Sequence, residues 1–376
     1  MPNIRKMMMA AAGASGGEVR KMWAWGKNPV GQLGDNTTTN RSSPVLVAGG
    51  SESWTVCSAG QDCSLGIRSD GTLWTWGRAS YGRLGDGQTS SNKSCPVQVG
   101  SLTDWNTDDV KKSSLYYQGF VIKDDGLLWG WGKNSAGQIG VGNTTANSSP
   151  VQVGSLTDWA HIVAGGSSSL AIKTNNTLWT WGYGDQGALG HGNRTYYSSP
   201  VQVGALTTWA FATMARHVLA VKTDGTLWAW GRAQAGALGL GDTTNRSSPV
   251  QVGSLTNWAT TAAGTDWSVA IKTDGTLWAW GNNSAGQLGQ GNTTDYSSPV
   301  QIGSLTDWSK VYTGPNARSW VALKTDNTAW SCGYNKYGIL GVGNTTNRSS
   351  PVQIGSETTW LQIDIKQGNT NSIQSA

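Results

Sequence analysis

Short apolar runs, each bounded by glycine, aspartate or asparagine, follow one another along almost the whole chain. A representative stretch has an apolar run at 268–272, the pair Asp274 and Gly275, and a second run at 276–280. Runs of this length that are rich in valine, isoleucine, threonine and tryptophan are typical of β-strands. Apolar residues do not recur at helical spacing, so the pattern predicts an all-β protein.

The runs belong to a repeat marked by Trp-x-Trp-Gly or a near copy of it, which occurs seven times at steps of 49 to 55 residues. The first tryptophans of the copies are Trp23, Trp74, Trp129, Trp179, Trp228, Trp278 and Trp330. A nearly constant period of this size indicates an array of repeated units, and four to eight four-stranded units close into a ring. We therefore predict a seven-bladed β-propeller of four-stranded antiparallel blades.

The two ends of the chain each supply part of one unit. The chain enters the repeat partway through a unit at 22–26, and its last segment, 360–373, matches 258–271. We expect strands from both termini to complete the first blade, which removes the exposed edges of an open array. A single propeller is predicted over 19–376, after a flexible or partner-docked extension at 1–18. The units open at Trp54, Trp105, Trp159, Trp209, Trp258, Trp308 and Trp360.

Asp-Gly pairs are expected to form the turn between the second and third strands of a unit. They occur at 70–71, 125–126, 224–225 and 274–275, with Asn-Asn at 175–176 and Asp-Asn at 326–327. Both central residues of a type I′ turn have positive φ, which suits these pairs. We interpret the aspartates as turn residues and not as catalytic groups.

The composition indicates that tryptophan is the main core residue. The chain has 22 tryptophans, of which thirteen lie in the motif and seven open a unit, so that only Trp267 and Trp320 fall outside the repeat. A buried tryptophan contributes a large apolar area, and its indole N–H needs an acceptor. The repeated tryptophans are therefore predicted to be structural.

Charge and chemistry exclude several classes of protein. The net charge is +5, but the basic residues are dispersed along the repeat, which argues against nucleic-acid binding. The four cysteines lie at unlike places in their units, and the three histidines form no set with serine and aspartate. We predict no enzyme, metal or cofactor. No apolar stretch is long enough to span a membrane, and the short run at 7–12 argues against secretion.

The stretch AIKTDGTLWAWGNNSAGQLGQGNTTDYSSPVQIG at 270–303 resembles the repeat of the regulator of chromosome condensation family. The resemblance covers the chain from about residue 19 and implies a seven-bladed propeller closed by both termini. Members act as exchange factors, ligase modules, enzyme inhibitors or scaffolds, so the fold does not fix the function. The founding activity, nucleotide exchange on the GTPase Ran, uses a hairpin wedge and a basic tail. The units here are short and uniform, and neither device is visible.

The opening NIRKMMMAAAG and the uniform repeats ending in SSPVQVGSLTDW resemble structural proteins of marine tailed bacteriophages. This resemblance implies a virion component used for head decoration, tail or baseplate attachment, or host adhesion. The main prediction is a non-enzymatic interaction or structural module in the virion, which binds other virion proteins or a cell-surface carbohydrate through one propeller face. The alternative is a cytoplasmic propeller that binds a protein partner or regulates a GTPase.

Departures from the repeat mark the candidate binding residues, because the consensus explains only the scaffold. Four departures are assigned to one connection, between the strand that opens a unit and the next strand, and equivalent connections of a ring lie on one face. We expect a rim of aromatic and basic side chains there, a composition favoured at contact sites, although drift in surface loops is the competing interpretation. The rim residues are Lys111, Lys112, Tyr116, Tyr117, Arg216, His217, Trp267, Arg318 and Trp320.

A second candidate is a group of tyrosines in the long connection of the fourth unit, Tyr183, Tyr196 and Tyr197. Aromatic rings in such a loop can stack on sugar rings, and tyrosine is also common as loop packing. This group is therefore the candidate surface for carbohydrate.

Overall fold

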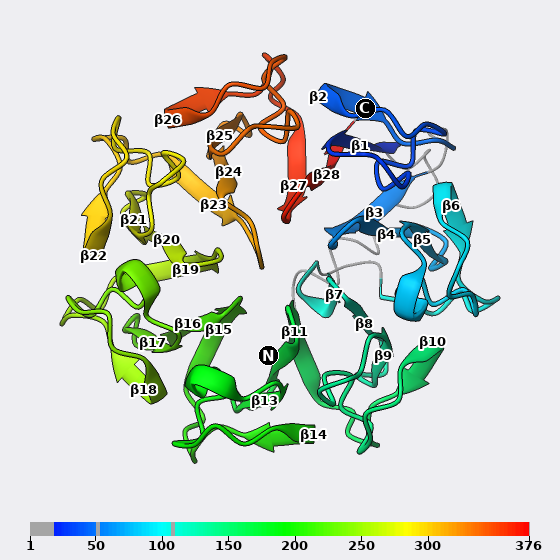
Figure 1. The fold of residues 1–376 in the computed structure, drawn as a ribbon, viewed down its shortest axis with the longest axis horizontal. Coiled ribbons are helices and arrows are strands. Elements are labelled where there is room, and N and C mark those ends of the chain that lie inside the picture. Colours follow the sequence, from blue (N-terminus) through cyan, green and yellow to red (C-terminus); the bar gives the residue numbers. More distant parts are fainter. Residues whose placement is uncertain (1–18, 50–52, 107–109, 376) are drawn as a thin grey trace, which may run out of the picture.

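Seven antiparallel sheets of four strands each stand around a central axis (Figure 1). The computed structural model describes residues 19–49, 53–106 and 110–375. The prediction of an all-β, seven-bladed propeller is confirmed. The expected N-terminal extension at 1–18 lies outside the described residues.

Within each blade the strands follow one order from the axis outward. The inner strands are β3 (Trp54–Ala59), β7 (Ser113–Leu115), β11 (Trp159–Gly165), β15 (Trp209–Met214), β19 (Trp258–Ala263), β23 (Trp308–Tyr312) and β27 (Trp360–Ile365). The second strands are β4 (Cys63–Arg68), β8 (Gln118–Ile122), β12 (Ser168–Lys173), β16 (His217–Lys222), β20 (Trp267–Lys272), β24 (Ser319–Lys324) and β28 (Asn369–Ser375).

The outer half of each blade is formed by the motif strand and a strand that contains a proline. The third strands are β1 (Arg20–Gly26), β5 (Leu73–Gly77), β9 (Leu128–Gly132), β13 (Leu178–Gly182), β17 (Leu227–Gly231), β21 (Leu277–Gly281) and β25 (Ala329–Gly333). The outer strands are β2 (Arg41–Leu46), β6 (Lys93–Gln98), β10 (Asn147–Gln152), β14 (Tyr197–Gln202), β18 (Arg246–Gln251), β22 (Tyr296–Gln301) and β26 (Arg348–Gln353). Proline suits an edge position because it donates no ladder hydrogen bond. Four short 3-10 turns complete the described elements: η1 (Ser80–Gly82), η2 (Val110–Lys112), η3 (Asp185–Gly187) and η4 (Gln234–Gly236).

The ring is closed by pairing the two ends of the chain. The first blade has the order β2-β1-β28-β27, and β1 pairs with β28 along its whole length, from Arg20 opposite Ser375 to Gly26 opposite Asn369. The predicted closure by strands from both termini is therefore confirmed. With its four strands in place, the first blade packs against a blade on either side and completes the ring.

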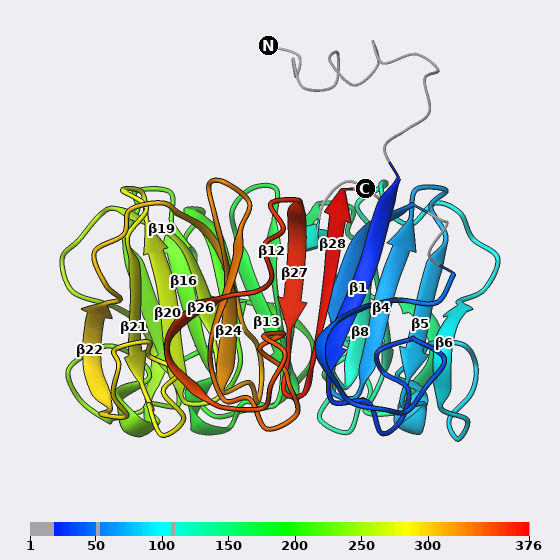
Figure 2. The same cartoon turned by 90° about the horizontal axis from the view of Figure 1, so that it is seen from above.

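Two faces of the disc can be told apart in Figure 2. The inner strand β27 runs downward and β28 returns upward in that view, so the inner-to-second connections lie on the lower face. We call this the loop face, and it also carries the long connections from third to outer strands. The upper face carries the Asp-Gly turns and the entries to the inner strands, and we call it the turn face.

The second tryptophan of the motif joins each blade to its neighbour. In six units it is buried, and its indole Nε1 donates to a carbonyl oxygen in the Gly-x-x-Gly loop of the adjacent blade at 2.8–3.1 Å. These tryptophans are Trp25, Trp76, Trp131, Trp181, Trp230 and Trp280. The structural role predicted for them is confirmed, and each indole N–H has the acceptor that burial requires.

Trp320 takes the place of the tryptophan that the seventh unit lacks. Cys332 occupies the second tryptophan position of that unit, and Trp320 lies directly opposite it in the pairing of β24 with β25. The Trp320 indole donates to the Gln287 carbonyl at 2.8 Å, which is the acceptor position used in the other six units. The indole has thus moved to the neighbouring strand while filling the same slot between blades.

The Asp-Gly turns differ from the type I′ geometry expected from the sequence. Only the glycine has positive φ, as at Gly71 with 78°, and the N–H of Gly71 donates to the carbonyl of Arg68. The loop is therefore a type I turn followed by a left-handed residue. Asp70 keeps an ordinary φ because its carboxylate accepts hydrogen bonds from the backbone N–H and the hydroxyl of Thr72. The interpretation of the aspartate as a turn residue is confirmed.

Candidate functional site

Two regions near the axis are candidate sites, a group of charged side chains on the loop face and a cavity that opens on the turn face. Both are formed by the inner strands and their connections. On the loop face the connections after β15, β19 and β23 carry Arg216, Asp266 and Arg318. On the turn face the inner strands begin around the mouth of a central cavity. The first region contains part of the rim expected from the sequence, and the second was not expected.

The loop face brings three arginines around one carboxylate. Arg232 Nη1 lies 3.5 Å from Asp266 Oδ1, while Arg216 and Arg318 are close enough to act on the same carboxylate electrostatically. Burial raises the pKa of Asp266, and the three guanidinium groups oppose that shift. Arg216 and Arg318 are exposed, and Arg318 Nη2 lies 3.4 Å from Ser284 Oγ. Three cations facing one anion leave this cluster with a net positive charge, and we call it the arginine cluster.

Four of the expected rim residues are not on the surface. Tyr116, His217, Trp267 and Trp320 each have a relative exposure of 0%. The expected exposure of these aromatic side chains is wrong, because their rings fill gaps between blades. Trp267 Nε1 donates to the Ala317 carbonyl of the next blade at 2.9 Å. Of the predicted rim, the loop face keeps Arg216 and Arg318 as exposed basic side chains and Tyr117 as a half-buried aromatic one.

Lys111 and Lys112 lie at the opposite end of the axis from the rest of the predicted rim. They belong to η2, which precedes β7, whereas the connection between β7 and β8 holds Tyr116 and Tyr117. Trp105, the opener of this unit, lies outside the inner strand and pairs with Lys123 in an isolated β-bridge. The extra residues of this unit are thus inserted before its inner strand. The four departures therefore do not all share one connection, as the sequence had led us to expect.

Tyr117 remains at the surface of the loop face, with two basic side chains beside it. The guanidinium carbon of Arg83 lies 5.2 Å from the Tyr117 ring centroid, and Lys133 Nζ lies 4.9 Å from it. Both distances fall within the range of cation–π contacts. Tyr117 is half-buried, so it extends the basic region of the loop face beyond the arginine cluster.

The connection after β23 bridges the axis on the loop face. Asn316 Nδ2 donates to the hydroxyl of Tyr116, which belongs to a blade on the other side of the ring. The same segment accepts hydrogen bonds at the Ala317 carbonyl from Thr265 and Trp267 of the adjacent blade. Figure 1 shows this connection reaching toward the middle of the ring. We call residues 313–318 the plug, because Gly314, Pro315 and Ala317 are buried beneath the loop face.

The plug closes one end of a cavity of about 490 Å³ along the axis. Thr313, Gly314 and Pro315 line this end, and the inner strands line the walls. At the other end Ser309 and Lys310 are exposed, so the cavity opens on the turn face. Its size is that of a pocket for a small molecule.

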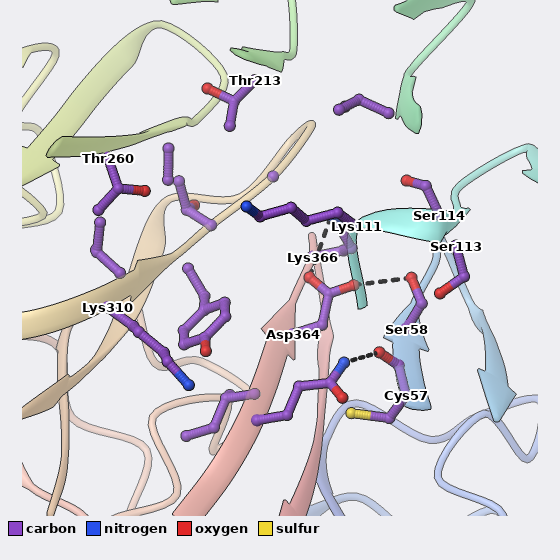
Figure 3. A pocket seen from close by; sticks show the side chains of 18 of the residues that line it. Cys57, Ser58, Lys111, Ser113, Ser114, Thr213, Thr260, Lys310, Asp364 and Lys366 are labelled. Atoms are coloured by element: carbon purple, nitrogen blue, oxygen red, sulfur yellow. Dashed lines mark hydrogen bonds and ion pairs between the residues drawn. The ribbon is translucent and has the colours of Figure 1, made fainter. Parts of the chain in front are cut away.

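Among the residues that the structure describes, the charged side chains lining this cavity are Arg20, Lys111, Lys310, Lys366 and Asp364. Figure 3 looks into the cavity and shows Asp364 joined to Ser58 and Lys366, with Lys310 on a separate part of the lining.

Asp364 is held by three groups. Ser58 Oγ and the Ala59 N–H each donate to its Oδ2 at 2.9 Å, and Lys366 Nζ lies 3.2 Å from its Oδ1. At the mouth, Lys310 Nζ donates to the Leu361 carbonyl at 3.2 Å, and Lys111 Nζ lies 5.7 Å from the Phe211 ring.

The tyrosines of the fourth unit form an exposed pair and a separate contact. The rings of Tyr183 and Tyr196 lie 4.8 Å apart and 46° from parallel, while Tyr197 packs edge-on against His191. Hydrogen bonds with Tyr196 and Asp185 raise the pKa of Tyr183. The structure thus brings Tyr183 and Tyr196 together at the surface and places Tyr197 beside them as loop packing.

The histidines occupy structural positions. Burial lowers the pKa of His161 and of His217 to about 3, so both rings are neutral near pH 7. His217 Nε2 lies 2.7 Å from Ser268 Oγ, whose hydroxyl donates to the Ala237 carbonyl at 2.7 Å. A serine whose proton is committed to a backbone carbonyl in the core has no path to a substrate. In the part of the chain that the structure describes, no group of three His, Cys, Asp or Glu residues could hold a metal.

Several residues of these regions were missed from the sequence. Arg232 and Lys310 occupy variable positions of otherwise regular units, so only their place in the ring makes them neighbours of distant residues. The insertion around Pro315 was visible in the sequence, but its path across the axis was not. No described helix has the length and apolar character that crossing a membrane requires.

Comparisons with known proteins agree with this architecture. The family model described as the regulator of chromosome condensation (RCC1) repeat matches at 21–67, 70–111, 125–172, 175–218, 224–271, 274–316 and 326–366. The E3 ubiquitin-protein ligase HERC2 of Homo sapiens is 30% identical over 150 residues, which are 39% of this chain and 3% of the ligase. The ultraviolet-B receptor UVR8 of Arabidopsis thaliana is 32% identical over 154 residues, which are 40% of this chain and 34% of the receptor.

Two solved structures share the whole ring. Human WBSCR16 superposes with a TM-score of 0.82 at 18% identity, over 95% of this chain and 99% of that one. Prp20p from Saccharomyces cerevisiae, a protein described with binding properties to Gsp1p and histones, gives a TM-score of 0.80 at 17% identity, over 96% of this chain and 92% of that one. At these identities the likeness establishes a common fold.

Proposed function

Because this chain belongs to the family of regulator of chromosome condensation (RCC1) repeat proteins, we propose that it is a non-catalytic propeller that binds a partner protein. The loop face is the binding surface, and an acidic segment of the partner is what it recognises. The observation that carries this proposal is the arginine cluster, in which Arg216, Arg232 and Arg318 face the single carboxylate of Asp266.

The chemistry of the cluster favours a carboxylate-bearing partner. Arginine presents planar donors that match a carboxylate with two hydrogen bonds, and it is enriched among residues that dominate binding energy. Arg216 and Arg318 come from blades on either side of the blade that carries Asp266. A rigid ring therefore holds the two exposed guanidinium groups in place before binding, which reduces the entropy lost on association.

The proposal can be tested by reversing charge at the cluster. We expect a fluorescein-labelled hexaglutamate peptide to bind the wild-type chain, and the double variant Arg216→Glu/Arg318→Glu to bind at least about tenfold more weakly, since two attractive contacts become repulsive. Arg194→Glu is the matched control, because Arg194 is equally exposed but lies in an outer connection. Fluorescence anisotropy at low and at physiological salt gives the affinities.

Arg194→Glu should melt at the wild-type temperature, whereas the cluster variant places two new carboxylates near Asp266 and should melt slightly lower, in an equally cooperative transition that shows it is folded. Equal peptide affinity for the cluster variant and the wild type would refute the assignment of the loop face. If the Arg194 control lost affinity as well, binding would depend on the overall charge of the protein and not on the arginine cluster.

Regulation of a small GTPase is the alternative within the same family. It is considered because the fold is similar to that of Prp20p, which is described as binding Gsp1p. Against it, the longest inner connection, the plug, folds across the axis and not away from the disc. Release of a fluorescent guanine nucleotide from Gsp1p, with and without this chain, tests the idea directly, and an unchanged release rate would eliminate it for that GTPase.

The comparisons favour a cellular role over the virion role that the N-terminus and repeat style suggested. The relatives named above are cellular proteins, and none supports a place in a virion. Carbohydrate binding stays as a second candidate because Tyr183 and Tyr196 form an exposed pair of rings. A glycan array probed with the wild type and with Tyr183→Ala/Tyr196→Ala would decide it, since a sugar held on these rings must be lost in the variant.

A further inference from the structure

A second pocket, of about 720 Å³, lies between the first and the seventh blades, which Figure 1 draws side by side. Trp23 of β1, Trp360 of β27 and Gln374 of β28 are among the residues that line it. Trp23 is the first tryptophan of its motif and Trp360 is the opener of its unit, so the same pair of rings recurs in every blade.

In the other six blades a basic side chain lies over these two rings. It is the residue paired with the opening tryptophan, as Lys272 is paired with Trp258. Its charged end lies 3.7–5.2 Å from the centroids of both rings, within the range of cation–π contacts. The six residues are Arg68, Lys123, Lys173, Lys222, Lys272 and Lys324. The paired rings are therefore a cation site that six blades fill with a side chain of their own.

The first blade has the two rings without the cation. Gln374 is paired with Trp360 and so takes the position of the lysine, but its amide is neutral. Among the residues that the structure describes, no lysine or arginine has its charged end over the ring of Trp23 or Trp360, in contrast to the contacts of the other blades. This aromatic pair thus lines a pocket and has no cation of its own.

The ring faces hold a cation even where no carboxylate assists them. In three blades an aspartate before the opening tryptophan pairs with the lysine at 2.9–3.2 Å, and the lysine Nζ lies 4.6–5.0 Å from the motif ring. Thr208 and Asn257 replace that aspartate in two other blades, and there Lys222 and Lys272 lie closer to the motif ring, at 3.7 Å. Thr359 has this place in the first blade, so a cation bound there would be attracted by the rings.

The remaining charges of the pocket are of both signs. Lys21 and Arg348 are half-buried and Glu357 is exposed. A primary ammonium group has three N–H donors that need acceptors, and the aspartate that supplies one in three blades is replaced here by Thr359. A quaternary ammonium group carries its charge without any N–H donor, and aromatic faces are the surface on which proteins recognise it.

We propose that this pocket binds a small quaternary ammonium compound, whose cationic head lies against Trp23 and Trp360 in the place that lysine or arginine takes in the other blades. A pocket of this volume has room for the rest of a small molecule beside the head. The site shares no residue with the arginine cluster. Partner binding on the loop face and ammonium binding in the pocket can therefore fail separately.

Choline is a suitable probe, and its neutral carbon analogue, in which a carbon atom replaces the nitrogen, is the matched control ligand. Both have the same shape, and only choline carries a charge. We expect saturable binding of choline to the wild type in a ligand-observed NMR titration. The carbon analogue should bind about tenfold more weakly or less, because ring faces attract the cation through its charge.

The variant Gln374→Lys gives the first blade the residue type that five other blades have at this position. It should abolish choline binding, because the new ammonium group fills the place over the rings and repels a second cation. Its melting temperature should equal or exceed that of the wild type. Gln88→Lys is the matched control variant, because it adds the same charge at an exposed position of another blade, and it should bind choline as the wild type does.

Three results would overturn the proposal. Equal affinity of the wild type for choline and for its carbon analogue would show that the charge is not recognised. Choline binding that survives Gln374→Lys, in a variant whose melting curve shows that it is folded, would place the cation elsewhere. A wild-type titration without saturable choline binding would remove the site.

Discussion

The move of one tryptophan from the third strand to the second strand in the seventh unit can be tested by moving it back. In the sixth unit Ser268 lies opposite Trp280, whereas in the seventh Trp320 lies opposite Cys332. The double variant Trp320→Ser/Cys332→Trp would therefore give the seventh unit the arrangement of the sixth. The single variant Trp320→Ser leaves the slot between the blades empty. The single variant Cys332→Trp places two indole rings where one fits.

The magnitude follows from burial. Trp320 has a relative exposure of 0%, and its indole N–H is bonded to Gln287. Removing a buried tryptophan costs about 3–5 kcal/mol. Inserting a second large side chain beside it costs about 1–3 kcal/mol. An unfolding entropy of about 2.1 cal/mol/K per residue means that a loss of about 4 kcal/mol lowers the Tm of a ring of this size by about 5 °C.

Thermal unfolding followed by circular dichroism gives the three shifts, and urea unfolding provides a second measurement. We expect Trp320→Ser to lower the Tm by about 5 °C, Cys332→Trp to lower it by less, and the double variant to return close to the wild type. A double variant whose loss equals the sum of the two single losses would refute the reasoning. It would mean that the two positions do not share one slot.

Three further predictions concern the repeated turn and its neighbours. Lys222→Ala should lose about 1 kcal/mol in urea unfolding, because Lys222 Nζ lies 3.7 Å from the Trp228 ring centroid, whereas Lys222→Met, which keeps the packing, should lose less. The hydrogen bonds from the next threonine lower the pKa of Asp224, so its contribution to stability is complete above about pH 4 and is lost as the pH falls through the folded pKa. Melting temperatures between pH 6 and pH 2 should therefore fall less steeply for Asp224→Asn, and parallel curves would contradict this. Gly275→Ala should destabilise more than Gly303→Ala, although both glycines have positive φ, because a Cβ at 275 would meet a carbonyl oxygen at 2.0 Å and a Cβ at 303 meets nothing; equal melting temperatures would contradict the clash.

Much of the fold was accessible from the sequence because the same local pattern is repeated. Each unit carries its own strand runs and its own turn, and seven copies set the number of blades. The turn was placed correctly but given the wrong type, since the sequence did not show that Asp70 would use its carboxylate to hold Thr72. That bond requires an ordinary φ at the aspartate, and it leaves the left-handed conformation to Gly71 alone.

The candidate site was predicted less well, and the errors have physical causes. An aromatic residue outside the repeat looks like a surface residue in the sequence, but Trp267 and Trp320 fill interblade slots whose size depends on the neighbouring blade. Lys111 was placed on the wrong face because the sequence could not show on which side of β7 the inserted residues lie. The exposed Arg216 and Arg318 were predicted as rim residues, and their use in binding stays a prediction.

The sequence by itself determined the seven units, their order of strands and the closure of the ring, because these follow from local periodicity and from the complementary halves at the two ends. Only the tertiary structure decided which residues of different units meet. Asn316 reaches Tyr116 across the axis, and the arginines of separate blades share Asp266. Such encounters depend on the curvature of the ring and on the path of single loops, which no repeat unit encodes alone.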